Sequence, residues 1–418
     1  MSDEARALLE GGDIPGLLRH LRFHAEEMNL AEVARLMEGA AALSGFDDLR
    51  EAAAAVAVQA APQELYDFGY ACVERGVPFL AVPALREALR LVPREKALVM
   101  ELVSALEREE RHEEAVAVLD DQSALDDWPD RYLLAHNALM AGDLDRASDE
   151  AARLATPADD RWLPARDRLA RALGRAEAAR SAGPLDDRDL RGWHFALGGG
   201  VLLTLSPFGF DDGMNGRFAY LGDSYDACRR SIERLRLVLD AAGQRPREVA
   251  LLDDRSSRIL GLATAEVLGL PARPFEPGRP SVLVVAYDLR EVDAGPLWER
   301  AEEQILFEHA TCWTDPPQVS ADVSGVLHQT VTRPWGERLR LDPERREPER
   351  LPEDERSPEE LASEIVRADP QAEPGDDGAP ADGDDVLTAF VAAVRDRWLT
   401  GTRDAVHSPG PVHSSRFL

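Results

Sequence analysis

The sequence predicts a mixed fold class, α plus α/β, in which an array of antiparallel helical hairpins precedes a small α/β domain and a disordered acidic tail. Three observations predict it. From Asp3 to Arg180, apolar residues recur at i, i+3, i+4 and i+7 between short Gly, Pro or Asp turns, as in successive amphipathic helices. After Gly183, strand-like and helical stretches alternate. From 342 to 385, Pro, Asp and Glu dominate. The expected parts are a helical domain (1–182), an α/β domain (184–341), an acidic linker (342–385) and an amphipathic helix with a free tail (386–418).

Landmark residues in the array recur at a period of about 34 residues. Residues 62–95 carry small and apolar landmarks, namely Leu65, Phe68, Gly69, Gly76, Ala81, Leu85, Ala88 and Pro93. A second copy keeps Ala115, and a third keeps Gly142 and Ala147. This pattern resembles the tetratricopeptide repeat (TPR) family over about residues 1–180, most clearly over 62–159. Nothing after residue 183 resembles a family that we recognise.

The resemblance implies that one face of the first helix of each repeat lines a concave groove for a protein or peptide. The matching positions that we single out are Tyr66, Tyr70 and Glu74 in the first copy, Met100 and Arg108 in the second, and Tyr132, His136 and Met140 in the third. Rigid rings supply contact area at low entropic cost, which suits peptide recognition. The alternative is that several of these residues pack between repeats.

The individual elements follow from periodicity and turn signals. Before the repeats, helices are expected over Ile14–Glu27, Leu30–Leu43 and Asp47–Gln59. In the second domain we expect a strand or strand pair over Trp193–Leu205, strands over Phe218–Leu221, Val249–Asp253 and Val282–Leu289, and helices over Asp223–Ala242, Arg258–Leu268 and Gly295–Ala310. A later helix is expected over Val386–Leu399.

One loop in the second domain is a candidate anion site. A predicted strand ends near Asp253 and Asp254, and a helix follows Arg255, Ser256, Ser257 and Arg258. Backbone N–H groups at a helix start, two hydroxyls and two guanidinium groups suit a phosphate-bearing ligand. The alternative is a capped helix with solvated arginines. An enzyme would require this loop to converge with His309, Asp288 or Asp322 in one pocket.

Four residues with metal-ligand chemistry lie within twenty positions of each other: His309, Cys312, Asp315 and His328. The spacing contains one His-x-x-Cys pair and no second tight pair. A histidine at a helix end beside a buried cysteine is the simpler interpretation. His194, between two aromatic residues, is expected to be a core histidine. We therefore assign no metal site, no catalytic residue and no cofactor.

Composition narrows the function. A net charge of −30 over 418 residues disfavours nucleic acid and anionic membranes. Lys96 is the only lysine, so chemistry that needs a lysine has one candidate. Three distant cysteines and an N-terminus without a signal peptide favour a cytoplasmic protein. The sequence therefore predicts an adaptor or scaffold that binds a protein or peptide through the TPR groove. The alternative is an enzyme or sensor for an anionic ligand in the α/β domain. The sequence favours a non-catalytic protein over an enzyme. It leaves open whether the protein forms a homo-oligomer.

Overall fold

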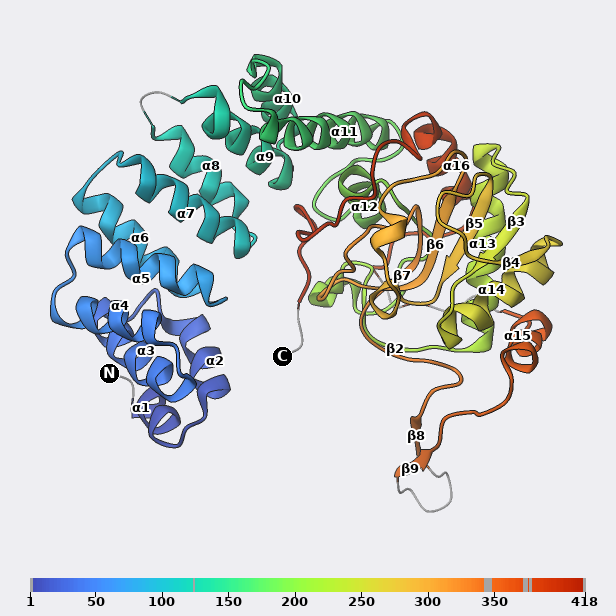
Figure 1. Cartoon of the computed structure of the whole chain (residues 1–418), viewed down its shortest axis with the longest axis horizontal. Helices are drawn as coiled ribbons and strands as arrows, with labels where there is room; N and C mark the ends of the chain where they lie inside the picture. The colour runs from blue at the N-terminus through green and yellow to red at the C-terminus, as the bar shows by residue number, and fades with distance from the viewer. Residues whose placement is uncertain (1–2, 123–124, 342–347, 371–374, 376–377, 416–418) are drawn as a thin grey trace. The chain divides into compact units, whose positions relative to one another are not determined.

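The computed structural model describes residues 3–122, 125–341, 348–370, 375 and 378–415 (Figure 1). Packing divides the chain into two compact units, Met1–Leu163 and Pro164–Leu418, here called the array and the α/β unit. The sequence pattern predicts the boundary near residue 183, at the end of helix α11 (Leu163–Arg180). In the structure the boundary lies at the start of that helix.

The array consists of helices, most of which pack against their neighbours in the chain, as the hydrophobic periodicity predicted (Figure 1). The helices are α1 (Asp3–Glu10), α2 (Ile14–His24), α3 (Leu30–Ser44), α4 (Asp47–Val58), α5 (Pro62–Glu74), α6 (Pro78–Leu91), α7 (Lys96–Arg108), α8 (His112–Asp120), α9 (Tyr132–Met140) and α10 (Leu144–Arg153). Gly76 and Gly142 adopt φ of 75° and 85° in the turns after α5 and α9. Glycine takes this left-handed conformation without strain, which explains two of the landmark positions.

A continuous apolar core runs through the array and includes Phe68, Leu85 and Leu102 from successive helices. Gly69 of α5 faces α6, where a Cβ atom on residue 69 would lie 2.6 Å from the Leu85 side chain. The missing side chain thus allows α5 and α6 to approach closely. Local sequence pattern and close packing agree here.

The α/β unit is built on a parallel sheet with the order β1-β7-β6-β5-β3-β4, and β2 also pairs with β7 (Figure 1). Every pairing in it is parallel. The strands are β1 (Val201–Leu202), β2 (Phe218–Gly222), β3 (Glu248–Leu251), β4 (Ala272–Pro274), β5 (Val282–Ala286), β6 (Ile305–Cys312) and β7 (Val323–Thr332). Strands β4 and β5, which follow β3 in the chain, pair on opposite sides of β3. This reversal of the strand order is the kind of switch point at which α/β sheets form ligand sites.

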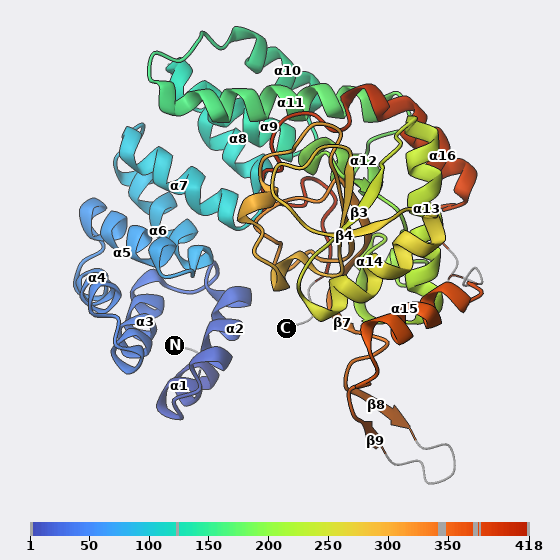
Figure 2. The ribbon, with the colours of Figure 1, turned by 45° about the vertical axis from the view of Figure 1, so that its right-hand side comes forward.

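The two faces of this sheet are covered differently. Helix α14 (Arg255–Leu268) packs on β3 and β5, and α13 (Tyr225–Ala242) packs beside it (Figure 2). We call this the helix face. On the other, loop-covered face, alternate residues such as Val284 and Leu306 pack with Leu297 and Val319 from loops. Successive side chains of a strand point to opposite faces, so each strand contributes to both environments.

Two predicted elements differ from the structure. The stretch expected as a strand from Trp193 forms helix α12 (Leu190–Gly198), capped by Asp189 and ended by Gly199, before the short β1. The stretch expected as a helix over Gly295–Ala310 instead contains β6, whose residues are all buried. Polar residues among the apolar residues of β6 give a spacing that resembles the amphipathic spacing of a helix. The sequence pattern does not show that other elements cover both faces of this strand.

The acidic segment expected to be disordered is ordered in its described part. It contains β9 (Pro348–Leu351), which pairs antiparallel with β8 (Arg338–Leu341) just before the segment, and helix α15 (Pro358–Arg367). Ser357 and Glu360 form a capping box at the start of α15, and the helix buries Leu361 and Ile365. The expectation of disorder is therefore wrong for 348–367, which contain β9 and α15, and for Asp382, which pairs with the buried Arg234. The rest of the segment lies outside the described residues.

The C-terminal residues are also held in place. Helix α16 (Asp384–Val394) packs on α13 and buries Leu387 and Val391. Beyond it, the backbone carbonyl of Val412 accepts a hydrogen bond from Arg217 at 2.8 Å. The helix agrees with the predicted amphipathic element, but the described tail up to residue 415 is not free.

Candidate functional sites

The three residues that the resemblance singled out in the first copy lie on one face of α5. Tyr66, Tyr70 and Glu74 are spaced by four residues, so they follow each other along the helix surface. The rings of Tyr66 and Tyr70 stack with centroids 6.4 Å apart. Tyr70 is 49% exposed and Glu74 is also exposed, whereas Tyr66 is half-buried. The face is thus aromatic and accessible.

Carboxylates surround this aromatic pair. Burial raises the pKa of Tyr66, and Glu101, Tyr70 and Asp67 raise it further. Burial likewise raises the pKa of Glu101 on α7, where Glu74 adds to the rise. Glu74 therefore lies close enough to Glu101 to disfavour its charged form, and the two carboxylates place acidic groups beside the tyrosines. We call Tyr66, Asp67, Tyr70, Glu74 and Glu101 the acidic aromatic face.

Arg108 and Met100, the two residues singled out in the second copy, lie on the same helix, α7. The Arg108 guanidinium donates to the Val73 carbonyl at 3.1 Å, which ties α7 to α5. Arg108 also lowers the pKa of Glu101 and so offsets part of the negative charge. Met100 is half-buried against the core of the array.

The third copy contributes mainly to packing. Tyr132 and Met140 are only 8% and 7% exposed. The Tyr132 ring lies between those of Trp128, with centroids 5.2 Å apart, and His136, at 5.9 Å, and Trp162 also lies at 5.9 Å. These residues form an aromatic cluster inside the array. For this copy the structure matches the alternative of packing between repeats.

The predicted anion loop caps its helix with its own side chains. Asp254 accepts a hydrogen bond from the Ser257 backbone N–H at 2.8 Å at the start of α14. The Ser257 hydroxyl accepts one from the Tyr287 N–H at 2.9 Å, and the Ser256 hydroxyl one from the Trp335 indole at 3.1 Å. Asp253 is exposed beside them. Asp254 Oδ1 and the hydroxyls of Ser256 and Ser257 thus have partners within the α/β unit, whereas the buried Asp254 Oδ2 has none among the described residues.

Both arginines of that loop face carboxylates from the acidic segment. Arg255 pairs with Glu353 at 2.7 Å, and Arg258 lies 3.5 Å from Glu359. A hollow of about 280 Å³ lies beside the loop and includes Arg255, Ser256, Arg333 and Trp335 in its lining. Its charges are mixed, because Arg333 pairs with Glu291 in the same wall.

An enzyme would require the loop at Asp254 to converge with His309, Asp288 or Asp322 in one pocket, but these three residues have other partners. Asp288 pairs with Arg290 at 2.6 Å. Asp322 pairs with Arg403 at 2.7 Å and also with Arg300. His309 lies inside the sheet, next to the Asp223 carboxylate.

The predicted group of metal-ligand residues is divided between the two faces of the sheet. His309 lies on the helix face, next to Cys228 of α13. Cys312 and His328 are paired neighbours on β6 and β7. The Asp315 side chain is 80% exposed and lies 3.4 Å from Arg290. The structure therefore does not bring these four residues together.

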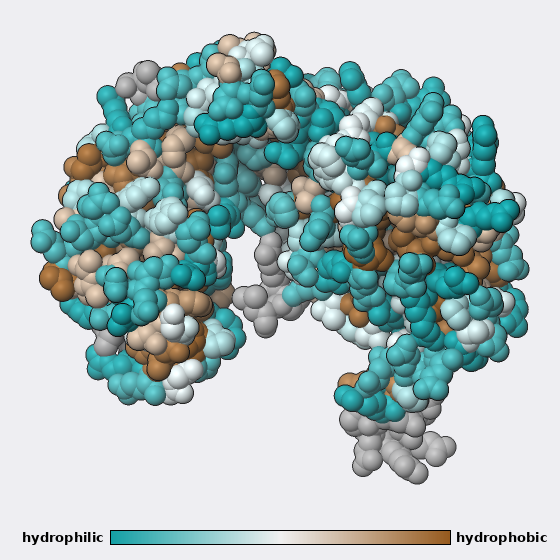
Figure 3. All heavy atoms as spheres, viewed as in Figure 1, coloured by the Kyte–Doolittle hydropathy of each residue, from teal (hydrophilic) through white to brown (hydrophobic). Residues whose placement is uncertain are grey.

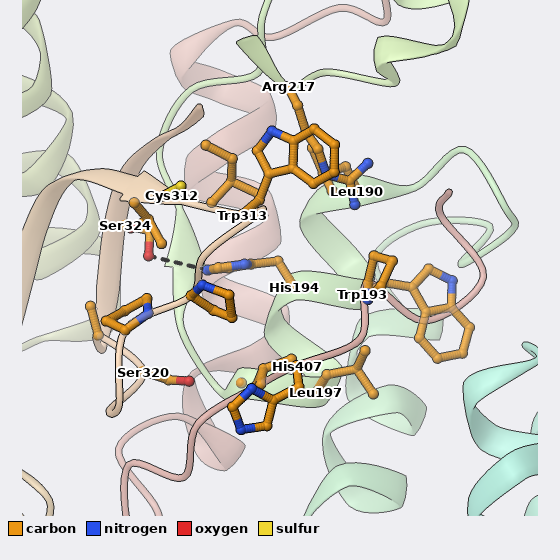
Figure 4. A pocket seen from close by; sticks show the side chains of 18 of the residues that line it. Leu190, Trp193, His194, Leu197, Arg217, Cys312, Trp313, Ser320, Ser324 and His407 are labelled. Atoms are coloured by element: carbon orange, nitrogen blue, oxygen red, sulfur yellow. Dashed lines mark hydrogen bonds between the residues drawn. The ribbon is translucent and has the colours of Figure 1, made fainter. Parts of the chain in front are cut away.

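A cavity of about 90 Å³ lies between α12 and the loop-covered side of β6 and β7 (Figure 4). Figure 4 shows His194 pointing from α12 toward Ser324, whose hydroxyl lies 3.2 Å from His194 Nε2. Trp313 lies beside Arg217 in the same wall, with the guanidinium 5.3 Å from the ring centroid.

Two titratable groups in the cavity wall are shifted by burial. Burial lowers the pKa of His194 to about 4, with Arg217 and Arg191 adding to the effect, so the ring is neutral at pH 7. Burial raises the pKa of Glu308 to about 8, although the Thr311 hydroxyl donates to it at 2.5 Å and the Leu289 N–H at 2.7 Å. His194 is a half-buried histidine that faces the cavity, whereas the sequence predicted a core position.

A buried polar cluster that sequence reasoning missed lies on the helix face. The Oδ2 atom of Asp223 lies 3.1 Å from His309 Nε2 and 3.3 Å from Cys228 Sγ. The same atom accepts a hydrogen bond from the Tyr287 hydroxyl at 2.6 Å. These residues come from the loop after β2, from α13, from β6 and from the end of β5. The sequence offers no local signal for the cluster, because its members are up to 86 positions apart.

Searches of protein families, curated proteins and solved structures find no match for this chain. Within the described residues, every helix is too short or too polar to span a membrane.

Proposed function

We propose that the array is a docking module of the TPR type, and that the protein is an adaptor that binds a basic segment of a protein partner. The repeat landmarks support the TPR assignment. So do the left-handed glycines after α5 and α9 and the close approach of Gly69 to Leu85. Localisation in the cytoplasm is part of the same proposal.

The observation that carries the proposal is the acidic aromatic face. Tyr70 is half exposed and is held by stacking on Tyr66, so its ring loses little further entropy on binding. Glu74 and Glu101 place negative charge next to that ring. Of the residues that the resemblance singled out on α5, Tyr70 and Glu74 are exposed.

The chemistry of this face favours arginine or lysine side chains. A guanidinium over a tyrosine ring gains about 0.5–1 kcal/mol at an exposed site, and adjacent carboxylates add charge-assisted hydrogen bonds. The net charge of −30 steers basic partners toward the protein at long range. We therefore expect binding to weaken as ionic strength rises.

A peptide array tests the proposal on the full chain. Peptides that are matched in apolar content but carry either Arg and Lys or Asp and Glu are probed with the wild type, with Tyr70→Ala and with Tyr220→Ala. Tyr220 is an exposed tyrosine of the α/β unit, at 61%, and serves as the matched control. We expect selective binding of basic peptides, about tenfold weaker for Tyr70→Ala and unchanged for the control. Equal binding of both peptide classes, or an effect of Tyr220→Ala equal to that of Tyr70→Ala, would contradict the proposal.

A second candidate, a sensor or enzyme for an anionic ligand, is favoured by the hollow beside the predicted loop. Arg255, Arg333 and Ser256 line it near the carboxyl ends of the strands. An anion would have to displace Glu353 and Glu291 from the two arginines. Inorganic phosphate that raises the melting temperature of the wild type, but not of Arg333→Gln, would favour this candidate.

A further inference from the structure

We propose that Asp223, Cys228 and His309 form a binding site for a divalent transition-metal ion of the zinc class. The three residues come from the loop after β2, from the first turn of α13 and from β6. Their side chains are buried, with exposures of 0% for Asp223 and Cys228 and 1% for His309. This inference is independent of the array, and it departs from the sequence-based expectation of no metal.

The distances between the donor atoms fit one tetrahedral ion. Asp223 Oδ2 lies 3.1 Å from His309 Nε2 and 3.3 Å from Cys228 Sγ, and the latter two atoms are 3.7 Å apart. Zinc bonds of usual length at tetrahedral angles place such donors roughly 3.3–3.6 Å apart. All three distances lie within a few tenths of an ångström of this range. An ion therefore fits between the donors without moving an element of the fold.

Hydrogen bonding alone describes the cluster less well. Asp223 Oδ2 receives three donors, from Tyr287, His309 and Cys228, while Oδ1 receives the backbone N–H of Ser224. A carboxylate oxygen offers about two lone-pair sites, so three donors exceed its capacity. With a metal ion bound, Oδ2 uses one site for the ion and one for the Tyr287 hydroxyl. The Tyr287 hydroxyl then donates the supporting hydrogen bond that metal-bound carboxylates usually receive.

Charge balance also favours a divalent ion. An Asp carboxylate and a Cys thiolate together neutralise a charge of +2, and His309 binds as the neutral ring. On binding, the Cys228 thiol releases its proton to solvent and the His309 proton moves from Nε2 to Nδ1. One proton is released per ion. An ion at this place would link the residue after β2 to α13 and β6, and its fourth position would be left for water or a ligand.

The test measures metal content in the full chain. The protein is purified without chelator, incubated with zinc, dialysed and analysed by mass spectrometry for metals. We expect about one ion per chain in the wild type and in Cys312→Ser, and less than a tenth of that in Cys228→Ser and His309→Gln. Cys312 is the matched control, because it is also buried and lies on the same strand as His309.

A cobalt measurement covers the case in which a variant does not fold. Cobalt is added to a chain that keeps Cys228 as its only cysteine, with Cys72→Ala and Cys312→Ala. A thiolate-to-cobalt absorption band is expected. A wild type without bound zinc, the absence of this band from the folded protein, or full metal content in Cys228→Ser would each overturn the proposal.

Discussion

The two units of the molecule use charged residues in different ways. In the array, ion pairs range from Arg75–Asp48, whose side chains are 39% and 49% exposed, to Arg131–Glu150, at 22% and 4%. In the α/β unit, Arg403 and Asp322 pair at exposures of 1% and 2%. Arg234, at 1%, pairs with Asp382 from the acidic segment. Exposed pairs contribute little to stability, whereas a buried pair that loses one partner is costly.

This difference teaches where stability and recognition reside. On the acidic aromatic face, carboxylates remain accessible to a partner. Figure 3 shows one side of the molecule, on which hydrophilic residues cover much of both units. Asp322 and Asp382 of the α/β unit instead join segments that are distant in the chain. Asp322 and Arg403, for example, are 81 positions apart. Substitutions in each unit test this contrast.

The largest effect is expected for Asp322→Asn. Asp322 accepts two hydrogen bonds from Arg403, at 3.0 and 2.7 Å, and one from the Leu306 N–H at 2.8 Å. Removing the charge leaves Arg403 buried without its counter-ion, at a cost of about 3–5 kcal/mol. Hydrogen exchange measured on peptides from each unit should be faster than in the wild type for the α/β unit and unchanged for the array. Asp315→Asn, at an exposed pair, is the control and should change neither unit.

A pH-dependent effect of a few kcal/mol is expected from Glu308. Its folded pKa of about 8 lies above the ordinary value of 4.5, so the folded protein binds more protons between these values. Stability from this group is complete below about pH 4.5 and is lost as pH rises through 8, because each tenfold difference in proton affinity between the folded and unfolded states corresponds to about 1.4 kcal/mol. Denaturant unfolding at pH 5 and pH 8 should show a larger loss for the wild type than for Glu308→Gln. A loss of equal size in both proteins would contradict the buried, protonated carboxyl.

In the array, Gly69→Ala should cost about 1–2 kcal/mol. The added Cβ meets the Leu85 side chain at 2.6 Å, and this overpacking outweighs the higher helix propensity of alanine. Gly174→Ala is the control, because its new Cβ would have its nearest neighbour, Arg397, at 3.8 Å. Thermal unfolding should show a lower midpoint for Gly69→Ala and an unchanged or higher one for Gly174→Ala.

The smallest effect on stability is expected for Tyr70→Ala. Tyr70 is half exposed, so its removal should change the free energy of unfolding by less than about 0.5 kcal/mol. The same substitution should weaken peptide binding strongly. A large loss of stability together with the loss of binding would show that Tyr70 is a packing residue.

The sequence predicted the array better than the α/β unit for a physical reason. Helices such as α3 and α4 are specified by local periodicity, and their observed ends fall within one residue of the expected ones. Strand β3, strand β5 and the loop at Asp254 were also placed correctly. By contrast, β6 was taken for a helix, because its polar residues are buried by partners from other elements.

The candidate sites divide in the same way. The tyrosines of α5 follow from repeat spacing, whereas burial of Tyr132 depends on Trp128 and Trp162 from outside its helix. The anchoring role of Asp382 depends on Arg191 and Arg234, which lie about 150 or more positions away. No local pattern distinguishes Asp382 from the solvated carboxylates around it. The Asp223 cluster was missed for the same reason.

Charge reversal on the acidic aromatic face tests the central claim most directly. Affinities of a basic and an acidic peptide of equal apolar content are measured by fluorescence anisotropy for the wild-type chain and for Glu74→Lys. Glu74 is exposed, so the substitution leaves the fold intact. We predict that the wild type prefers the basic peptide and that Glu74→Lys weakens its binding about tenfold or more while improving that of the acidic peptide. Unchanged affinities for both peptides would contradict the assignment of this face as the docking surface.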